Sequence, residues 1–286
     1  MGNGLATYYK TETRSKEFHA FGGLSWHDNA ARFHDTLFPR FTTVDPLSGK
    51  YPHISPYTYC AANPIMFIDP TGMAEFWHNG EVIGTDGIDD GRILVVKNTS
   101  STPDPNDSDK VILHKVKTSK VVDFIKTNSG KKDAFSENSD IYSSTIEIEG
   151  SAENRSQMVK IISQDSGKGG LGDNENREFG GAIKNGKVIE YEPGPVSYGG
   201  TMQIGLPSED SAFHGHASGS YKVNIDGITY TSTWVQPPSQ SDINTAGTLS
   251  RYVFGRGDKN VYIYNNTGVL AVFPDKYFIK PKKKNR

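Results

Sequence analysis

Closely spaced turn-forming residues limit this chain to short structural elements. The 286 residues include 30 glycines and 15 prolines, a content that favours strands and turns over long helices. Asn185 and Gly186 stand between two strand-like runs, and an Asn-Gly pair in that position is the strongest short-range signal of a β-hairpin. We therefore predict a mixed α/β (α+β) fold with a small sheet, and the 35% content of hydrophobic residues allows a real core.

The charge balance and the cysteine count exclude several classes of protein. With 31 basic against 33 acidic residues the net charge is −2, whereas a dedicated nucleic-acid binder usually carries a strong basic excess. The single cysteine, Cys60, rules out a disulfide scaffold and a cysteine-rich zinc site, and we expect it to pack as a small hydrophobic residue. No stretch of about 18 apolar residues is present, so we expect no membrane span. The polar N-terminal segment does not resemble a signal peptide.

Differences in amino-acid composition divide the chain into three parts. Residues 1–75 are rich in aromatic residues, Pro, Asn and Asp, and their short apolar bursts end in turn dipeptides, so we expect short strands there. Residues 76–150 contain no pattern typical of a chemical site, and we expect a linker with a short β extension. Residues 151–286 carry the candidate site residues. Their basic end, residues 280–286, predicts a disordered, solvated tail.

Local patterns predict the individual elements of the second and third parts. We expect a short helix over 120–126, and the helical spacing of apolar residues predicts helices over 152–163 and 242–253. Strand-like runs around turn dipeptides predict hairpins over 178–191, 221–231 and 261–273. Residues 92–97 predict a further strand, whereas the Ser, Thr, Pro and Asp content of 98–109 predicts a loop.

His214 and His216 form the only close pair among the eight histidines. Residues two apart on an extended strand point to the same side, so both imidazoles can reach one cation at about 2.0–2.1 Å and leave two tetrahedral positions. Asp242 offers a carboxylate as the third ligand, and three protein ligands plus a water are the arrangement of a catalytic zinc site. The alternative is a pair of structural histidines that hold no metal.

A catalytic zinc site also needs a base that accepts a proton from the water and is not itself a ligand. Glu178, expected on the first strand of a hairpin, is the candidate, and Glu190 and Glu192 beyond the turn are the alternatives. Ser239 and Asp242 also fit a helix capping box, with Ser239 as the N-cap and Asp242 at the third helical position. The two roles of Asp242 are compatible, because a cap and a ligand can share a helix start.

Six segments in the N-terminal quarter of the chain form a recognisable pattern: 28–35, 39–47, 50–52, 55–60, 63–64 and 68–73. In these segments the chain resembles the core found at the C-terminal end of Rhs/YD-repeat proteins. In that family the core closes a β-strand shell around a variable C-terminal toxin and often cleaves itself after an Asp-Pro-x-Gly motif. The resemblance implies a fragment of such a core, cleavage after Met73, and Asp45 and Asp69 as the acids that carry it out.

The third part resembles the JAB/JAMM (MPN) family of zinc metallopeptidases, which carry a Glu on an early strand, then His-x-His-Pro, then Ser-x-x-Asp. It is most similar to the JAB-like toxin domains found behind Rhs cores. The resemblance implies that Glu178 is the general acid/base and that His214, His216 and Asp242 bind Zn²⁺. It also implies that Ser239 helps to stabilise the oxyanion. The fold implied is a small sheet flanked by helices.

Two features depart from the family pattern. Ala217 stands where the family has proline after the second histidine. The separation of 26 positions between His216 and Asp242 exceeds the usual dozen or so, and the extra residues lie in 218–235. Because a hairpin whose ends meet can be inserted at little cost in loop closure, we expect a β-flap beside the site that affects the choice of substrate.

These observations predict a zinc-dependent peptidase or isopeptidase that acts as the C-terminal toxin of an Rhs-type polymorphic toxin. The expected partners are a protein or peptide substrate and a cognate immunity protein, with no nucleic acid. The resemblance implies a bacterial protein, cytoplasmic when made and then secreted or delivered to a target cell. The alternatives are a metal-dependent nuclease that uses the same His-x-His, and a degenerate fragment without enzymatic activity.

Overall fold

A computed structural model describes most of the chain and all the candidate residues of the metal site. The described residues are 18–21, 24–28, 33–35, 40–44, 57, 74–88, 90–199, 202–208 and 210–282. Asp45, Cys60, Asp69 and Met73, for which the sequence made specific predictions, lie outside these ranges. The described part is a mixed α/β structure with several sheets, as predicted. None of its helices combines the length and the apolar character that a membrane crossing requires.

Short antiparallel strands occupy the described part of the N-terminal segment. They form one sheet in the order β1-β2-β3-β4, and the strands are β1 (Phe18–Phe21), β2 (Leu24–Asp28), β3 (Phe33–Asp35) and β4 (Arg40–Phe41). Each strand pairs with the next along the chain. The backbone N–H of Phe41 donates to the Tyr57 carbonyl at 2.8 Å, which joins the last strand to a later segment.

A second sheet is built from residues 75–147 and is covered by helices. Its order is β10-β7-β5-β6, with strands β5 (Glu75–His78), β6 (Glu81–Thr85), β7 (Ile93–Val96) and β10 (Thr145–Glu147). The helices are α1 (Ser119–Asn128), α2 (Lys132–Glu137) and η3 (Ser139–Ser144). Phe76 from β5, Ile125 from α1 and Phe135 from α2 share one buried cluster. The predicted strand at 92–97 and the predicted helix at 120–126 are both confirmed.

The segment predicted as a loop at 98–109 is instead part of a hairpin, β8 (Thr99–Asp104) paired with β9 (Asp107–Lys115). The polar composition indicated a loop because most of these side chains face solvent. Val111 and Leu113, which alternate along β9, nevertheless pack against a buried cluster that contains Ile243, Tyr262 and Val269. Asn98 fixes the start of the hairpin, since its side chain both accepts from and donates to the Val272 backbone. Contacts with residues far along the chain therefore stabilise a hairpin in a segment whose polar composition favours a loop.

The largest sheet has the order β12-β11-β13-β16-β17-β18. Its strands are β11 (Gly180–Lys184), β12 (Lys187–Glu190), β13 (Ser211–His216), β16 (Arg251–Gly255), β17 (Asn260–Asn265) and β18 (Gly268–Pro274). Only β13 and β16 pair in parallel; the other pairs in this sheet are antiparallel. The predicted hairpins at 178–191 and 261–273 are confirmed. Asn185 and Gly186 have φ of 51° and 72°, the left-handed conformations that a tight hairpin turn requires.

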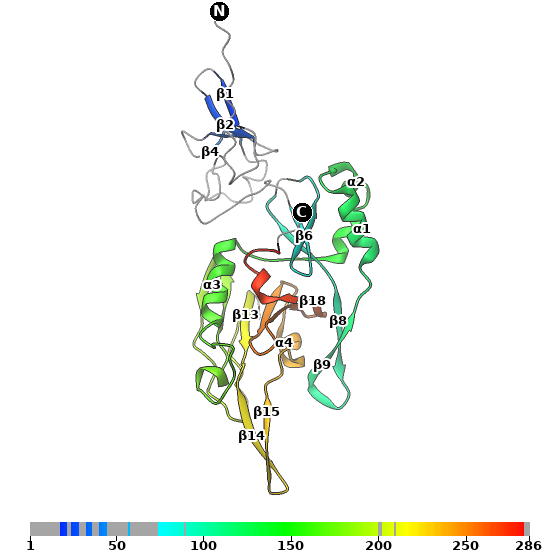
Figure 1. Ribbon diagram of the computed structural model, residues 1–286. Helices are drawn as coiled ribbons and strands as arrows, with labels where there is room; N and C mark the ends of the chain where they lie inside the picture. Colours follow the sequence, from blue (N-terminus) through cyan, green and yellow to red (C-terminus); the bar gives the residue numbers. More distant parts are fainter. Residues whose placement is uncertain are drawn as a thin grey trace, which may run out of the picture.

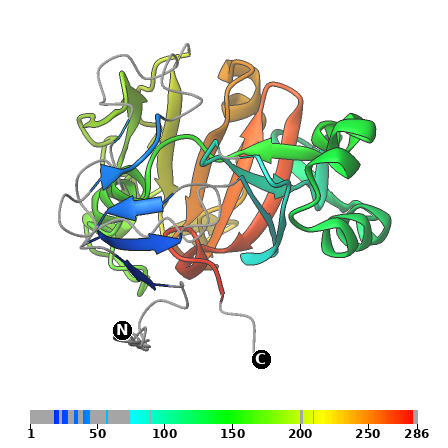
Figure 2. The ribbon, with the colours of Figure 1, turned by 90° about the horizontal axis from the view of Figure 1, so that it is seen from above.

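The core runs continuously from the second part of the chain into the third. Helix α3 (Ala152–Ile162), predicted at 152–163, places Met158 and Ile162 on the large sheet. The same buried cluster contains Trp77 and Val95 from the smaller sheet and Phe213 from the large one. Figure 2 shows the strands of the two sheets beside each other, with α1 and α2 at one end. The sequence composition changes at 150–151, where we predicted a boundary, but one hydrophobic core contains residues from both sides of it.

The helix predicted over 242–253 is wrong for most of its length. The helix present, α4 (Gln240–Thr245), has six residues, and residues 251–255 form β16 in the middle of the large sheet. Leu249, assigned to the apolar face of the helix, is 44% exposed. The β-branched and aromatic run Tyr252-Val253-Phe254 is fully buried on both faces, which is typical of a central strand. Only Val253 of this run belonged to the helical spacing from which the helix was predicted.

Two smaller features lie at the edges of the structure. The hairpin of β14 (Ser220–Ile225) and β15 (Ile228–Thr233) is present as predicted and projects from the body of the molecule (Figure 1). The tail predicted to be solvated is tied down as far as Lys282, whose N–H donates to the Gly80 carbonyl at 2.6 Å. Strand β6 lies at the edge of its sheet, and its Glu81 forms a parallel bridge with Lys282. The basic composition of the tail predicted solvent exposure because it does not show that a free strand edge lies nearby. The remaining short helices are η4 (Asn174–Asn176) and η5 (Asp275–Tyr277).

Candidate metal centre

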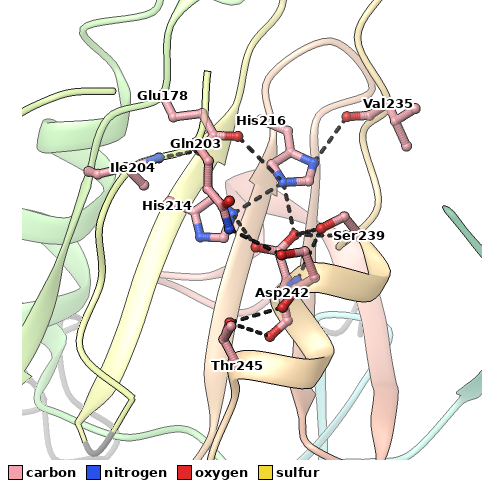
Figure 3. Close-up of polar contacts among 10 residues, drawn as sticks. Glu178, Gln203, Ile204, His214, His216, Val235, Ser239, Asp242 and Thr245 are labelled. Carbon is pink, nitrogen blue, oxygen red and sulfur yellow. Dashed lines mark hydrogen bonds and ion pairs between the residues drawn. The ribbon is translucent and has the colours of Figure 1, made fainter. Parts of the chain in front are cut away.

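Strand β13 brings the two histidines to the same side of the large sheet. His214 pairs with Gly180 of β11 and with Val253 of β16, so it is held between two neighbouring strands. His214 and His216 are 2% and 7% exposed. Their Nε2 atoms lie 3.1 Å apart (Figure 3). The prediction that this His-x-His lies on a strand with its imidazoles converging is confirmed.

The second ring nitrogen of His216 is held by the backbone. His216 Nδ1 lies 3.0 Å from the Val235 carbonyl oxygen. Because a carbonyl can only accept, Nδ1 carries a proton and donates it, so Nε2 is the nitrogen that can bind a ligand once its own proton has left. His214 Nδ1 is buried without a hydrogen-bond partner among the described residues. Only one of the two imidazoles therefore has its orientation fixed by an outer hydrogen bond.

Asp242 reaches both imidazoles from the first turn of α4. Its Oδ1 lies 3.3 Å from His214 Nε2, and its Oδ2 lies 3.4 Å from His216 Nε2. Burial by itself raises the pKa of Asp242, but the charges and hydrogen bonds of His214 and His216 hold that pKa well below its usual value. Burial likewise lowers the pKa of His216, but the hydrogen bond and charge of Asp242, with Glu178, raise it to about 9.

The capping box at the start of α4 is also present. The Asp242 N–H donates to Ser239 Oγ at 3.1 Å, while the Ser239 N–H and hydroxyl both donate to Asp242 Oδ2 at 2.7 Å. The cap thus fixes the rotamer that points the carboxylate at the histidines. The capping box predicted from this motif is confirmed, and the same Asp242 side chain faces the imidazoles. Its role as a metal ligand stays a prediction.

Glu178 lies two residues before β11 rather than on it, which corrects the sequence assignment. Backbone bonds still continue the sheet past its end: Gly215 N–H donates to the Phe179 carbonyl, and Gly194 N–H donates to the Glu178 carbonyl. The Glu178 side chain is 8% exposed. Its Oε2 accepts from the Ile204 N–H at 3.0 Å, and its Oε1 lies 3.8 Å from His216 Nε2. Burial raises the pKa of Glu178 against the opposing pull of the two histidines.

The donor atoms of this cluster can hold a metal ion. Glu178, His214 and His216 each offer one ligand atom, and these atoms lie within 4.8 Å of one another in a buried position. Around a tetrahedral ion with ligands at 2.0–2.1 Å, neighbouring donor atoms are about 3.3 Å apart. The separation of 3.1 Å between the two Nε2 atoms is close to that edge. The Asp242 carboxylate approaches each imidazole at a similar distance, with Oδ1 3.3 Å from His214 and Oδ2 3.4 Å from His216. The 3.8 Å separation between Glu178 and His216 is longer.

The alternative carboxylates do not lie at this cluster. Glu190, at the end of β12, accepts a hydrogen bond from Gln164 at 2.7 Å on the protein surface. Glu192 is exposed beyond it. Neither residue lines the pocket around the histidines. Glu178 is therefore the carboxylate, besides Asp242, that the described structure brings to the site.

A pocket of about 240 Å³ opens beside the cluster and contains residues that the sequence did not single out. Its wall includes Glu178, His214 and Asp242, together with Gln203, Thr245, Arg251 and Tyr264. Arg251 and Tyr264 are neighbours across β16 and β17, so only the strand pairing brings them to the site. Recognising 251–255 as a strand from its β-branched and aromatic content would have brought Arg251 near His214, because β16 pairs with β13.

Searches against protein-family models, curated proteins and solved structures found no match to this chain.

Proposed function

We propose that this protein is a zinc-dependent peptidase or isopeptidase whose metal ligands are His214, His216 and Asp242. The observation that carries the proposal is the convergence of three buried side chains. The two imidazole Nε2 atoms lie 3.1 Å apart, and Asp242 places Oδ1 3.3 Å from one and Oδ2 3.4 Å from the other, each close to the spacing of neighbouring ligand atoms around zinc. Two imidazoles and one carboxylate leave a fourth position for water or substrate, the arrangement of a catalytic rather than a structural zinc site. The similarity to the JAB/JAMM motif order supports the same reaction.

When bound, zinc would supply a Lewis acid that polarises the amide carbonyl and makes water a stronger acid. Glu178 accepts a proton from the attacking water and passes it to the leaving amine, so one peptide bond and one water become a carboxylate and an ammonium group. The raised pKa of Glu178 suits a group that must both take and return a proton near neutral pH. Its 3.8 Å separation from His216 leaves it beyond the edge length of the ligand set.

Ser239 supports the site chiefly through Asp242. Its hydroxyl donates to Asp242 Oδ2 at 2.7 Å, which orients the carboxylate and uses the hydroxyl proton. The family resemblance assigns Ser239 to the oxyanion, and that role requires the hydroxyl to exchange its carboxylate acceptor for the substrate oxygen. We propose that Ser239 also stabilises the oxyanion in this way when substrate is bound.

The biological setting is also part of the proposal. We propose that the N-terminal segment derives from an Rhs core and that the third part acts as its toxin, with a protein or peptide substrate and an immunity partner. The acids proposed for self-cleavage, Asp45 and Asp69, belong to the same hypothesis. Mass spectrometry of protein recovered from cells tests it, because cleavage after Met73 gives a fragment that begins at Ala74 and intact chains alone count against it.

Metal analysis and peptide hydrolysis test the proposed function together. We expect about one zinc per chain in the parent and in His114→Ala, a control in the exposed β9, but little zinc in His214→Ala or Asp242→Ala. We expect the zinc-loaded parent to cleave peptide or ubiquitin-conjugate substrates and to leave plasmid DNA intact. Zinc retained in both ligand variants contradicts the ligand set, and plasmid cleavage with inert peptides indicates the nuclease alternative.

The variant Glu178→Gln tests whether Glu178 acts as the catalytic base and not as a metal ligand. Glutamine keeps nearly the same shape but cannot accept the proton, so zinc content stays while turnover falls by about 10²–10⁴-fold, the usual contribution of general acid–base catalysis. Glu190→Gln is the matched control, because Glu190 lies on the surface away from the pocket. Equal turnover in Glu178→Gln and the parent means that another group takes the proton.

A further inference from the structure

Arg251 places a buried positive charge in the wall of the pocket beside the metal cluster. The residue is 2% exposed and lies at the start of β16, and His214 and Asp242 line the same pocket. Its Nη2 donates to the Pro207 carbonyl, whereas its Nε has no hydrogen-bond partner. Among the described residues no carboxylate forms an ion pair with Arg251 within 4.0 Å. The guanidinium thus retains an unused donor and lacks a counter-ion.

Other buried arginines show how such a charge is normally satisfied. Arg256 is 8% exposed, and its guanidinium lies 3.5 Å from the Asp275 carboxylate and donates to the Asp165 carbonyl. Arg155 also has an unpartnered Nε, but its guanidinium lies 5.9 Å from the Trp77 ring centre in the core and does not line the pocket. An unpartnered Nε alone is therefore not a binding site. The location of Arg251 in the pocket wall is what distinguishes it.

Burying a guanidinium away from water costs free energy unless an anion compensates its charge. Among the anionic groups common in peptides, a carboxylate best matches the planar arrangement of its N–H donors. The neighbouring phenol of Tyr264 is 1% exposed and accepts a hydrogen bond from Arg251. Burial raises the pKa of Tyr264 against the effect of that hydrogen bond, so the phenol is neutral and its O–H can donate. The pocket of about 240 Å³ has the volume of about eight waters at ~30 Å³ each. That space accommodates a group of residue size.

We propose that the pocket binds a carboxylate of the substrate at Arg251, next to the amide carbonyl that reaches the metal. This inference rests on the proposed function and adds the substrate class: peptides that carry an acidic group adjacent to the cleaved bond. The carboxylate is either the free C-terminus of the peptide or an Asp or Glu side chain. Both sources present the same planar anion to Arg251.

Binding of a small carboxylate tests the role of Arg251 without any catalysis. The probes are propionate and its neutral analogue propionamide, titrated by NMR into the full chain after zinc removal, so that a metal cannot anchor the carboxylate. Because a hydrogen bond to a charged group is worth more than a neutral one, we expect propionate to bind about tenfold more tightly than propionamide. Arg251→Met should abolish that difference, and Arg155→Met, another buried arginine outside the pocket, should preserve it.

Matched peptides then distinguish the two sources of the carboxylate. One pair differs only in a free or an amidated C-terminus, and a second, amidated pair differs only in Glu or Gln beside the cleaved bond. We expect the acidic member of one pair to have a kcat/KM about tenfold higher, and we expect this ratio to fall to about one in Arg251→Met. The pair that shows the preference identifies the source.

Two results overturn the inference: equal binding of propionate and propionamide by the parent protein, or an acid preference that survives in Arg251→Met. Arg251→Lys guards against a variant that merely misfolds, since it keeps the charge and should retain part of the preference. If zinc-loaded protein cleaves none of the four peptides while propionate binding still depends on Arg251, the proposed peptidase function fails and the carboxylate site stands.

Discussion

At the scale of single residues, the proton and the metal compete for His216. The pKa of its imidazole, raised to about 9 chiefly through Asp242 against the effect of burial, means that metal-free His216 is protonated at neutral pH. A metal ion must displace that proton from Nε2, because Nδ1–H is bound to the Val235 carbonyl. The Asp242 carboxylate already carries its charge in this range, since its pKa is held low.

We therefore expect zinc affinity to rise about tenfold per pH unit between pH 7 and 8 and to level off above about pH 9. The sign follows from the raised pKa: the ion pair of protonated His216 with Asp242 stabilises the metal-free fold below the ordinary histidine pKa, and that stabilisation is lost as the pH rises towards 9. Competitive titration with a chelator at several pH values measures the affinity. An affinity independent of pH would show that His216 is not a ligand.

The residue scale is also where the sequence was most informative. The spacing of His214 and His216, with a strand-like context, was enough to predict that the imidazoles converge. Asp242 was identified through its motif, and its capping box fixes the rotamer that the site requires. Arg251 and Tyr264 could not be found in this way, because they reach the pocket through strand pairing between distant segments.

At the scale of elements, two helices begin with the same device and only one of them faces the site. Ser239 caps α4 and bonds to Asp242, while Ser151 caps α3 and bonds to Asn154. Loss of an N-cap serine costs about 1 kcal/mol. Ser239→Ala should lose comparable stability and also weaken zinc binding, because the Asp242 carboxylate loses a donor that orients it.

Ser151→Ala is the matched control for this prediction, since α3 packs on the core and contributes no residue to the pocket. Chemical denaturation gives the free energy of unfolding of both variants, and chelator competition gives their zinc affinity. Equal zinc affinity in both variants would mean that the cap does not position Asp242.

The β14–β15 hairpin gives a second prediction for an element. Its outer part exposes apolar side chains, with Ile225, Ile228 and Tyr230 at 54%, 58% and 49% exposure. Tyr221 and Ser232 are cross-strand partners, so the segment between them can be replaced by a short turn at little cost in loop closure. We expect the shortened protein to keep zinc and peptide hydrolysis and to lose activity on protein substrates. Unchanged activity on both would exclude a role in substrate choice.

The element scale also shows why sequence patterns gave mixed results. Turn chemistry at Asn185-Gly186 predicted its hairpin correctly, because a left-handed turn is a local requirement. The helix predicted over 242–253 ends at Thr245. Burial of Tyr252, Val253 and Phe254 in the sheet outweighs the helical spacing of Ile243, Ala246, Leu249 and Val253. A strand buried on both faces lacks the alternating pattern that would identify it.

At the scale of the whole molecule, the metal site depends on a core that extends beyond the third part of the chain. Trp77 is 1% exposed and belongs to the same buried cluster as Phe213 of β13, the strand that carries both histidines. Composition suggested a linker in residues 76–150 because their surface is polar, whereas their buried residues complete this cluster. The two parts are thus expected to unfold together.

Trp77→Ala should lower the free energy of unfolding by about 3–5 kcal/mol, as expected for a buried tryptophan. Urea denaturation followed by circular dichroism should show one transition, and zinc release should coincide with it. Val44→Ala, at a 49% exposed position outside this core, is the control and should leave the transition unchanged. Residues 151–286 expressed alone with full stability and normal zinc binding would contradict a shared core.

The central claim is that His214, His216 and Asp242 hold one zinc ion and that Glu178 stands beside it as the base. Anomalous X-ray diffraction at the zinc absorption edge, from crystals of the zinc-loaded protein, tests this most directly. We expect a single peak at about 2.0–2.2 Å from His214 Nε2, His216 Nε2 and one Asp242 oxygen, with the Glu178 carboxylate outside ligand distance. A peak bound by Glu178 in place of Asp242, or no peak between the two histidines, would contradict the account.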